Sequence, residues 1–282
     1  MPQLDFKGRS LNYLPFGKTS WDATTPVYVV LSTEYRDTET AAKFYREFPD
    51  TVPGIILDPT NMGGSSRLDR SLEPEEVLEE LRHVLAALNI ARPVIVGYCS
   101  NAELAMYCGQ RIDNAAIILH SPLVRWGCGA FIEMFYGAMK RAILARDAYN
   151  LTTILNLVDL HSKGFRENKN FFLADQIATA QSLKDPEHFW IKTLQNKPTG
   201  QFDWEDMPAC DRPVLMLRGV HDPLQPINFL RECMQADRHQ IVELDNSHRI
   251  LDDQLEQVID HMTRFVSMLS EGEMSRHLEE VA

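Results

Sequence analysis

The stretch PVIVGYCSNAELA, residues 93–105, carries the most information about the fold. Its first half has the pattern of a buried strand and its second half that of a helix, so a tight turn must join them. A nucleophile at such a junction has a strained backbone and requires small neighbours, because bulky ones would clash with it. Gly97 lies two positions before Cys99, whereas a nucleophile at Ser100 would place the bulky Tyr98 there. We therefore assign Cys99 as the nucleophile of a nucleophile elbow.

Asn101 stands two positions after Cys99, where elbows of this kind usually have a second glycine. Asn101 is therefore a departure from the pattern, although asparagine is the non-glycine residue that tolerates unusual backbone angles at the least cost. The alternative interpretation is that Cys99 is a buried structural thiol at a strand–helix junction. A chemical role for Cys99 therefore needs support from the rest of the chain.

Short aliphatic runs alternate with longer helical patterns on both sides of the elbow. Helical spacing of apolar residues begins at Pro74 and recurs over residues 250–269. The predicted strands are a hairpin-like stretch at residues 4–15 and runs at residues 27–31, 54–57, 93–96, 115–119, 214–217 and 240–244. This alternation is typical of βαβ units, and it predicts an α/β fold with a mostly parallel sheet flanked by helices.

The alternation stops in residues 122–198, which we interpret as a helical lid insertion. Segments rich in Met and aromatic residues have helical periodicity there, at residues 130–145 and 151–160. Because a strand pattern resumes after the insertion, the lid belongs to one domain. The α/β core then consists of residues 1–121 and 199–282.

A cysteine nucleophile needs a base and a group that orients the base, and the sequence offers candidates for both. Asp222 and His248 each follow a predicted strand, which gives the chain order of nucleophile, acid and histidine that an elbow requires. Their joint placement at the ends of consecutive strands favours a catalytic role over ordinary surface positions. Asp245 is the alternative orienting acid, and we interpret His221 as a loop residue.

On these residues the chain resembles the α/β-hydrolase superfamily over nearly its whole length. Residues 57–66, LDPTNMGGSS, look like the superfamily's loop D-x-x-G-x-G-x-S, with Asn61 where the first glycine is common. Residues 219–222, GVHD, resemble its G-x-x-D acid loop, and residues 247–248, SH, resemble its terminal G-H. The resemblance implies an α/β-hydrolase fold. The catalytic triad that it implies is Cys99, Asp222 and His248.

One element of the superfamily is missing from the sequence. The loop after the strand at residues 27–31 ordinarily reads His-Gly and supplies one backbone N–H of the oxyanion hole, but here residues 32–35 read STEY. The resemblance implies that Ser100, directly after the nucleophile, supplies the other N–H. Thr33 or Glu34 must then replace the missing donor. The loss of the glycine predicts a narrower or differently shaped cleft.

A cysteine nucleophile favours thioester chemistry, since exchange between thiols is nearly isoenergetic and water competes poorly. Within the superfamily, elbows with cysteine occur in dienelactone hydrolases, polyhydroxyalkanoate synthases, some nonribosomal-peptide thioesterases and the aminoacyltransferases of those pathways. In size, lid and elbow, this chain is similar to the aminoacyltransferases that act between carrier proteins.

Three hypotheses about function follow. The first is an acyl- or aminoacyltransferase that takes an acyl group from a phosphopantetheinyl carrier onto Cys99 and passes it to another thiol. The second is a thioesterase or small-molecule hydrolase that uses the same triad with water as the acceptor. The third is a catalytically inactive binding protein with a hydrolase fold, which the altered loop after the strand at residues 27–31 favours.

The composition restricts partners and location. The chain has 282 residues and a formal net charge of −12, which opposes binding to nucleic acid or to an anionic membrane surface. No apolar run approaches the ~18 residues of a membrane span. The five scattered cysteines and the lack of a secretory signal predict a cytoplasmic protein. Nothing predicts a metal site or a resident cofactor, although the donor is expected to carry a phosphopantetheine thioester.

The predicted lid has a different charge from the rest of the chain. Residues 122–198 contain ten Lys and Arg against seven Asp and Glu, a net charge of +3, which leaves −15 on the remainder. Carrier proteins are generally acidic, so we expect an acyl- or aminoacyl-carrier protein to dock near Lys140 and Arg141 on the lid. The alternative is that these charges only solvate the outer face of the lid helices.

Three further residues are candidates for binding the small-molecule acyl group. Tyr98 precedes the nucleophile, and His120 ends the strand predicted at residues 115–119. Trp126 opens the Met- and aromatic-rich part of the insertion, where residues that pack helices together are the commoner explanation. For His120, the alternative is a hydrogen-bonded core histidine.

Overall fold

The computed structural model describes residues 1–33, 38–123, 129–157, 183–187, 204–225 and 227–271. These residues form a sheet with the strand order β1-β2-β4-β3-β5-β6-β7-β8. Its strands are β1 (Gln3–Phe6), β2 (Arg9–Gly17), β3 (Pro26–Leu31), β4 (Pro53–Leu57), β5 (Arg92–Tyr98), β6 (Ala116–His120), β7 (Val214–Gly219) and β8 (His239–Leu244). β2 pairs antiparallel with β1 and β4, and the other pairs are parallel. The predicted hairpin and all six predicted strands are present.

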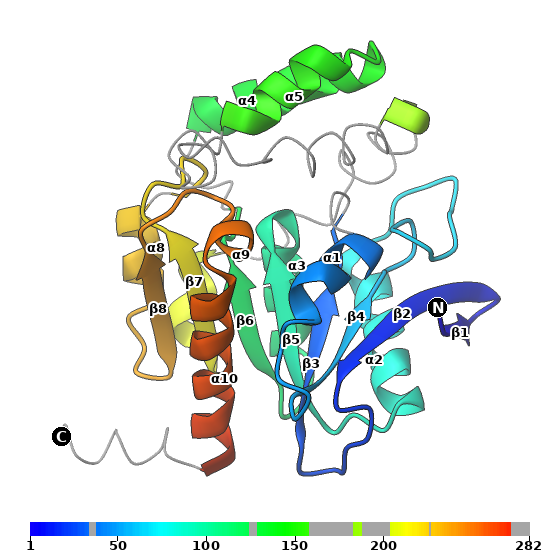
Figure 1. Ribbon diagram of the computed structural model, residues 1–282, viewed down its shortest axis with the longest axis vertical. Coiled ribbons are helices and arrows are strands. Elements are labelled where there is room, and N and C mark those ends of the chain that lie inside the picture. The colour runs from blue at the N-terminus through cyan, green and yellow to red at the C-terminus, as the bar shows by residue number, and fades with distance from the viewer. Residues whose placement is uncertain (34–37, 124–128, 158–182, 188–203, 226, 272–282) are drawn as a thin grey trace.

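Helices cover both faces of the sheet because alternate residues of each strand point to opposite sides. On one face, Val27, Val29 and Leu31 of β3 pack in the same apolar cluster as α2 (Pro74–Ala87), α3 (Ala102–Gln110) and α8 (Ile227–Cys233). On the other, Tyr28 and Val30 pack in the cluster that contains residues of α1 (Thr38–Tyr45), α9 (Ile250–Asp253) and α10 (Leu255–Glu271). Figure 1 shows α1, α9 and α10 in front of the sheet. The predicted α/β architecture is confirmed.

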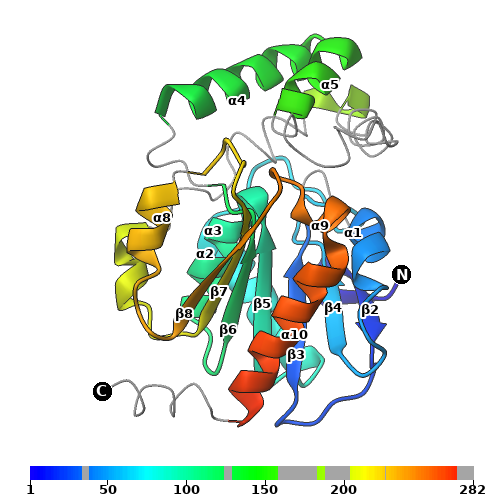
Figure 2. The ribbon, with the colours of Figure 1, turned by 60° about the vertical axis from the view of Figure 1, so that its left-hand side comes forward.

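The helix predicted over residues 250–269 is instead two helices. α9 ends at Asp253, and the backbone of Gln254 leaves the helical region, with φ −135° and ψ 36°. The Gln254 side chain donates to the carbonyl oxygen of Asp245, 3.5 Å away, in the loop after β8. α9 therefore stays close to that loop, while α10 runs along the sheet, as Figure 2 shows. Neither Gly nor Pro marks the break, so periodicity alone could not locate it.

Between β6 and β7 in the sequence, in the segment predicted to be a helical insertion, the described residues include two long helices. They are α4 (Gly129–Leu144) and α5 (Ala148–Asn156), and both lie beyond the carboxyl ends of the parallel strands in Figures 1 and 2. Phe135 and Met139 of α4 pack in one cluster with Leu224 from the loop after β7, and Cys99 lies against that cluster. The helices thus cover the edge of the sheet at which β5 ends. A lid function, and the limits of the insertion at residues 122 and 198, remain predictions.

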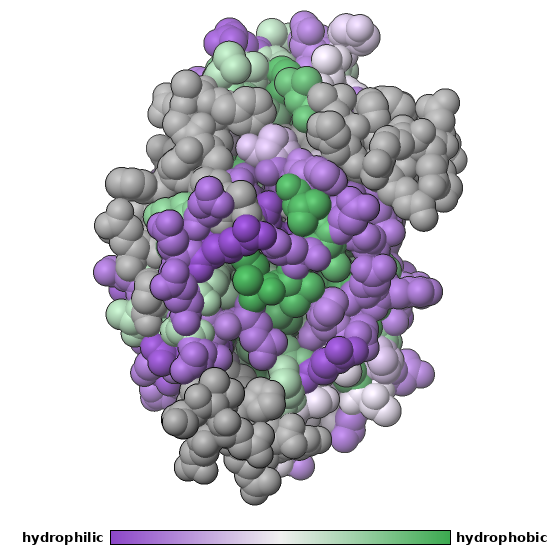
Figure 3. Space-filling view, turned by 90° about the vertical axis from the view of Figure 1, so that its left-hand side faces the viewer, coloured by the Kyte–Doolittle hydropathy of each residue, from purple (hydrophilic) through white to green (hydrophobic). Residues whose placement is uncertain are grey.

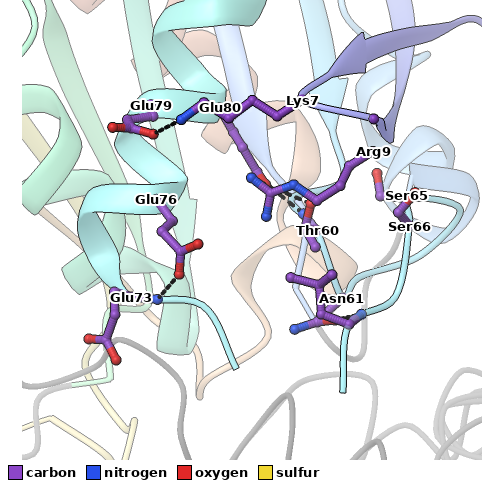
Figure 4. Close-up of polar contacts among 12 residues, drawn as sticks. Lys7, Arg9, Thr60, Asn61, Ser65, Ser66, Glu73, Glu76, Glu79 and Glu80 are labelled. Carbon is purple, nitrogen blue, oxygen red and sulfur yellow. Dashed lines mark hydrogen bonds and ion pairs between the residues drawn. The ribbon is translucent and has the colours of Figure 1, made fainter. Parts of the chain in front are cut away.

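A buried carboxylate fastens α2 to the N-terminal part of the sheet, as Figure 4 shows. Glu80 is 1% exposed and accepts hydrogen bonds from the Thr60 hydroxyl at 2.6 Å and the Thr60 N–H at 3.0 Å. The guanidinium of Arg9 on β2 lies 3.3 Å from the same carboxylate. Burial raises the pKa of Glu80, and the bonds from Thr60 and the charge of Arg9 only partly oppose this. Glu80 therefore joins β2, the loop after β4 and α2.

This arrangement predicts different costs for two substitutions of Glu80. Glu80→Ala should lower the free energy of unfolding by about 2–4 kcal/mol, because it leaves two buried donors of Thr60 without an acceptor. Glu80→Gln keeps one acceptor oxygen and should cost less. Because the pKa of Glu80 is raised in the folded state, ionisation of this carboxyl disfavours that state, and the contribution of Glu80 to the free energy of unfolding should fall as the pH rises from acid to neutral. Urea unfolding at several pH values measures both effects, and the Gln variant should lack this part of the pH dependence.

Candidate active site

The predicted elbow is present between β5 and α3. Cys99 has a φ of 51°, in the left-handed region that a residue with a side chain adopts only at a cost in energy. Gly97 permits the turn, because a Cβ added there would lie 2.5 Å from the carbonyl oxygen of Asn101 and 2.6 Å from Cβ of Ala105. Cys99 is partly exposed, whereas Gly97 and Ser100 on either side of it are buried. The turn therefore presents Cys99 at the edge of the sheet that α4 and α5 cover.

Asn101 does not use the tolerance for unusual backbone angles that asparagine offers. Its backbone has φ −86° and ψ −1°, close to helical values. The strain of the turn is confined to Cys99, and Asn101 already belongs to the first turn of the helix. Its fully buried side chain instead donates a hydrogen bond from Nδ2 to the carbonyl oxygen of Ser32, in the loop after β3. No feature of the sequence pattern indicated this contact.

The structure brings Asp222 and His248 together. Oδ2 of Asp222 lies 2.7 Å from Nδ1 of His248, and Oδ1 accepts a hydrogen bond from the N–H of Leu224 at 2.9 Å. Both side chains are buried. Each carboxylate oxygen therefore has a donor, and the carboxylate holds the imidazole through Nδ1, which leaves Nε2 for chemistry.

The loops that carry the acid and the histidine are fastened to each other. The N–H of Val220 donates to the carbonyl oxygen of Leu244 at 2.9 Å. The N–H of His221 donates to the carbonyl oxygen of Asn246, also at 2.9 Å. Gly219 allows this close approach, since a Cβ there would overlap the carbonyl oxygens of Asn246 and Ser247. The glycine of the G-x-x-D motif is thus required by packing between the loops after β7 and β8.

The electrostatic surroundings of His248 favour its protonated form. Burial lowers its pKa, but interactions with Asp222, Tyr98 and Cys99 raise it, and the net pKa lies well above the usual value. The ring of Tyr98 lies 5.6 Å from the imidazole, centroid to centroid. A protonated imidazole at this position is suited to act as a proton donor.

The alternative acid has a different partner. Asp245 is exposed, and its Oδ1 lies 3.0 Å from Nε2 of His221, which is exposed as well. The structure thus places Asp245 beside His221 and Asp222 beside His248.

The remaining candidates are placed as follows. Thr33 is buried directly after Ser32, and Glu34 and Trp126 lie outside the described residues. His120 is fully buried at the end of β6, where the sheet register pairs it with Tyr98, which is partly exposed. The binding and oxyanion roles of these residues stay predictions.

Sequence reasoning did not identify Ser121, which follows β6 beside the elbow. Its φ is 41°, and its buried hydroxyl has no hydrogen-bond partner among the residues that the structure describes. Two residues later, the N–H of Leu123 donates to the carbonyl oxygen of Cys99 at 3.0 Å. A lone serine after a strand gives no signal in the sequence, because only the backbone angle reveals the sharp turn.

Among the described residues, no group of three or more His, Cys, Asp or Glu side chains is arranged to hold a metal ion. None of the helices in those parts of the chain is both long and apolar enough to span a membrane.

Solved structures with the same fold are found over nearly the whole chain. An α/β-hydrolase enzyme, MGS-M2, from a deep-sea metagenome library of the Medee basin has a TM-score of 0.75 and 16% identity, covering 94% of this chain and 97% of its own. A thermophilic esterase from Thermogutta terrifontis has a TM-score of 0.74 and 16% identity, covering 96% of this chain and 100% of its own. A meta-cleavage product hydrolase, CumD, has the same TM-score and identity, covering 94% and 97%.

No protein-family model matches the sequence, and neither does any curated protein. At these identities the likeness establishes the fold alone. The chain has the α/β-hydrolase fold, as predicted.

The contacts of the two acids predict opposite effects on the imidazole. Asp222→Asn should lower the pKa of His248, because it removes the carboxylate that raises it, and activity at neutral pH should fall. Asp245→Asn should leave that pKa unchanged, since Asp245 contacts His221 instead. NMR titration of the His248 ring protons in both variants measures the shift. A larger effect from Asp245→Asn would show that the acid is wrongly assigned.

Proposed function

We propose that this chain is an enzyme that moves acyl groups through a covalent thioester on Cys99, with His248 as the acid–base group and Asp222 as the group that orients it. The observation that carries the proposal is the strained, partly exposed Cys99 at the elbow, together with a buried histidine whose pKa is raised and whose Nδ1 is held by a carboxylate. Such an arrangement supplies a thiolate and a proton donor at the same place.

In the first half of the proposed reaction, the Cys99 thiolate attacks the carbonyl carbon of a donor thioester. The negative charge that forms on the carbonyl oxygen is stabilised by backbone N–H groups, for which Ser100 and Thr33 are the candidates. The bond from the carbonyl carbon to the donor sulfur then breaks. The imidazolium of His248 gives its proton to the departing thiolate, which leaves an acyl-Cys99 thioester and a neutral imidazole.

In the second half, an acceptor thiol gives its proton to His248 and attacks acyl-Cys99. Breakage of the bond to Cys99 regenerates the thiolate–imidazolium pair and completes the transfer. Attack by a thiol exchanges one thioester for another of similar energy, which favours transfer. With water as the acceptor, the same steps release a carboxylic acid. The esterase and hydrolases that share the fold make hydrolysis the second candidate function.

Formation of an acyl-enzyme can be tested by intact-protein mass spectrometry with small acyl and aminoacyl thioesters of N-acetylcysteamine. We expect the mass of one acyl group on the wild type and none on Cys99→Ala. Cys99→Ser should retain weak activity biased towards hydrolysis, since an oxygen ester is a poorer donor to an incoming thiol.

The outcome also separates the hypotheses. A stable adduct that a second thiol discharges supports transfer, and turnover without an adduct supports hydrolysis. The absence of both adduct and turnover would contradict the proposal and support the binding-protein hypothesis.

For the transferase, we further propose that the donor is an acidic acyl- or aminoacyl-carrier protein that docks on α4 and α5. Arg141 is exposed and lines a cavity of about 340 Å³ between the two helices, with Asp147 and Asn150. Met134 on α4 and Tyr149 on α5 are 64% and 80% exposed. In Figure 3, the described part at the top of the molecule, where α4 and α5 lie, shows hydrophobic side chains among hydrophilic ones. A mixed surface of this kind suits an acidic partner that also offers apolar side chains.

The docking surface predicts a difference between two donors. Replacement of Lys140 and Arg141 by Glu should slow the acylation of Cys99 by a carrier-bound donor, and the effect should shrink at high salt because the attraction is screened. Acylation by a small thioester should be nearly unchanged. Stopped-flow or quenched mass spectrometry gives both rates. Equal losses with both donors would indicate damage to α4, and no loss with either would contradict docking at this surface.

A further inference from the structure

Two departures from the superfamily pattern lie in contact with each other. The loop after β3 lacks the glycine that the superfamily has there, and the elbow has Asn101 in place of its second glycine. Nδ2 of Asn101 donates to the carbonyl oxygen of Ser32, the first residue of that loop. The side chain of Asn101 is fully buried and Ser32 is 2% exposed, so this bond is shielded from water.

The bond fixes the peptide group that follows Ser32. The N–H of Ser32 donates to the carbonyl oxygen of Leu57 on β4 at 2.9 Å, so Ser32 is held at its N–H as well as at its carbonyl oxygen. The peptide bond between Ser32 and Thr33 is trans, like the others in the described residues. In a trans peptide, the C=O of one residue and the N–H of the next point in opposite directions. Holding the carbonyl oxygen of Ser32 therefore sets the direction of the N–H of Thr33.

We infer that Asn101 is a positioning residue, which orients the backbone N–H of Thr33 for the oxyanion of the acylation step. The inference rests on the function proposed above. In the superfamily pattern a glycine shapes this loop, whereas here an amide from the elbow holds it. The nucleophile and the oxyanion donor are then fixed to each other through residues 99–101 and a single hydrogen bond, which limits their relative movement.

The experiment compares two reactions of the same thiol. Acylation by an N-acetylcysteamine thioester passes through an oxyanion, whereas alkylation by iodoacetamide requires the thiolate but forms no oxyanion. Asn101→Ala should slow acylation by roughly 10²-fold, the usual cost of losing one oxyanion donor. Its alkylation rate should stay within about twofold of the wild type. Asn12→Ala is the matched control, because Asn12 is an equally buried asparagine whose amide contacts Asp58 and Thr38 rather than the elbow.

A second variant tests the bond itself. Asn101→Asp has nearly the same shape but cannot donate while its carboxyl group is ionised. Once protonated, the introduced group can donate its O–H to the carbonyl oxygen of Ser32. For Asn101→Asp and for the wild type, the acylation rate is divided by the alkylation rate at each pH. As the pH falls, this ratio in the variant should therefore approach the ratio in the wild type. A ratio that stays low at every pH would contradict a role for the bond to Ser32 in acylation.

The outcomes separate the inference from the proposed function. If acylation and alkylation fall together in Asn101→Ala, Asn101 only supports the elbow and the inference is wrong. If acylation is unchanged, the bond to Ser32 has no part in the reaction, and the inference is wrong as well. If the wild type is alkylated at Cys99 but never acylated by any thioester tried, the proposed function has failed, which is seen before any variant is compared.

Discussion

The left-handed backbone at Cys99 is the constraint on which the candidate site depends. Such a conformation costs of order 1–3 kcal/mol and persists only where the surrounding structure enforces it. Here β5 and α3 are joined by a turn so tight that Gly97 has no room for a side chain. The chain leaving β6 adds a hydrogen bond from the N–H of Leu123 to the carbonyl oxygen of Cys99. Removing the strain would require moving β5, α3 or β6, all of which belong to the core.

The parallel sheet brings the other two groups of the proposed triad to the same edge. Asp222 follows β7 and His248 follows β8, and these neighbouring strands are paired up to their carboxyl ends, Gly219 with Leu244. β6 lies between β5 and β7, so the chain that leaves it passes close to the site. The chain that leaves β6 turns sharply at Ser121. The hydrogen bond from the N–H of Leu123 to the carbonyl oxygen of Cys99 then holds this chain along the elbow. Strand order alone therefore explains why residues more than a hundred positions apart in sequence can act together.

Much of this was predictable from the sequence, and the reasons are specific. Gly97 and Gly219 lie where a Cβ would overlap neighbouring backbone, so they are tied to a geometry and reveal it. The strands are short, apolar and bounded by turn residues, which makes their pattern strong. The break at Gln254 was not predictable, because it depends on the position of the loop after β8 rather than on a helix-breaking residue.

The contact of Asn101 with Ser32 could not be predicted from the sequence for a different reason. The two residues are 69 positions apart, and each looks like an isolated departure from a pattern. Asparagine is common where backbone angles are unusual, so local reasoning assigned it a backbone role, whereas its side chain carries the contact. Only the fold shows that these two departures from the motif are in contact with each other.

The raised pKa of His248 bears on the nucleophile that we propose. A serine hydroxyl is very weakly acidic, so a serine elbow needs a neutral imidazole to accept its proton during attack. An imidazole that holds its proton at neutral pH would be a poor base for serine. A thiol is intrinsically more acidic than a hydroxyl, so a cysteine nucleophile depends less on a neutral imidazole to take its proton. The raised pKa of His248, to which Cys99 itself contributes, is therefore compatible with cysteine at the elbow.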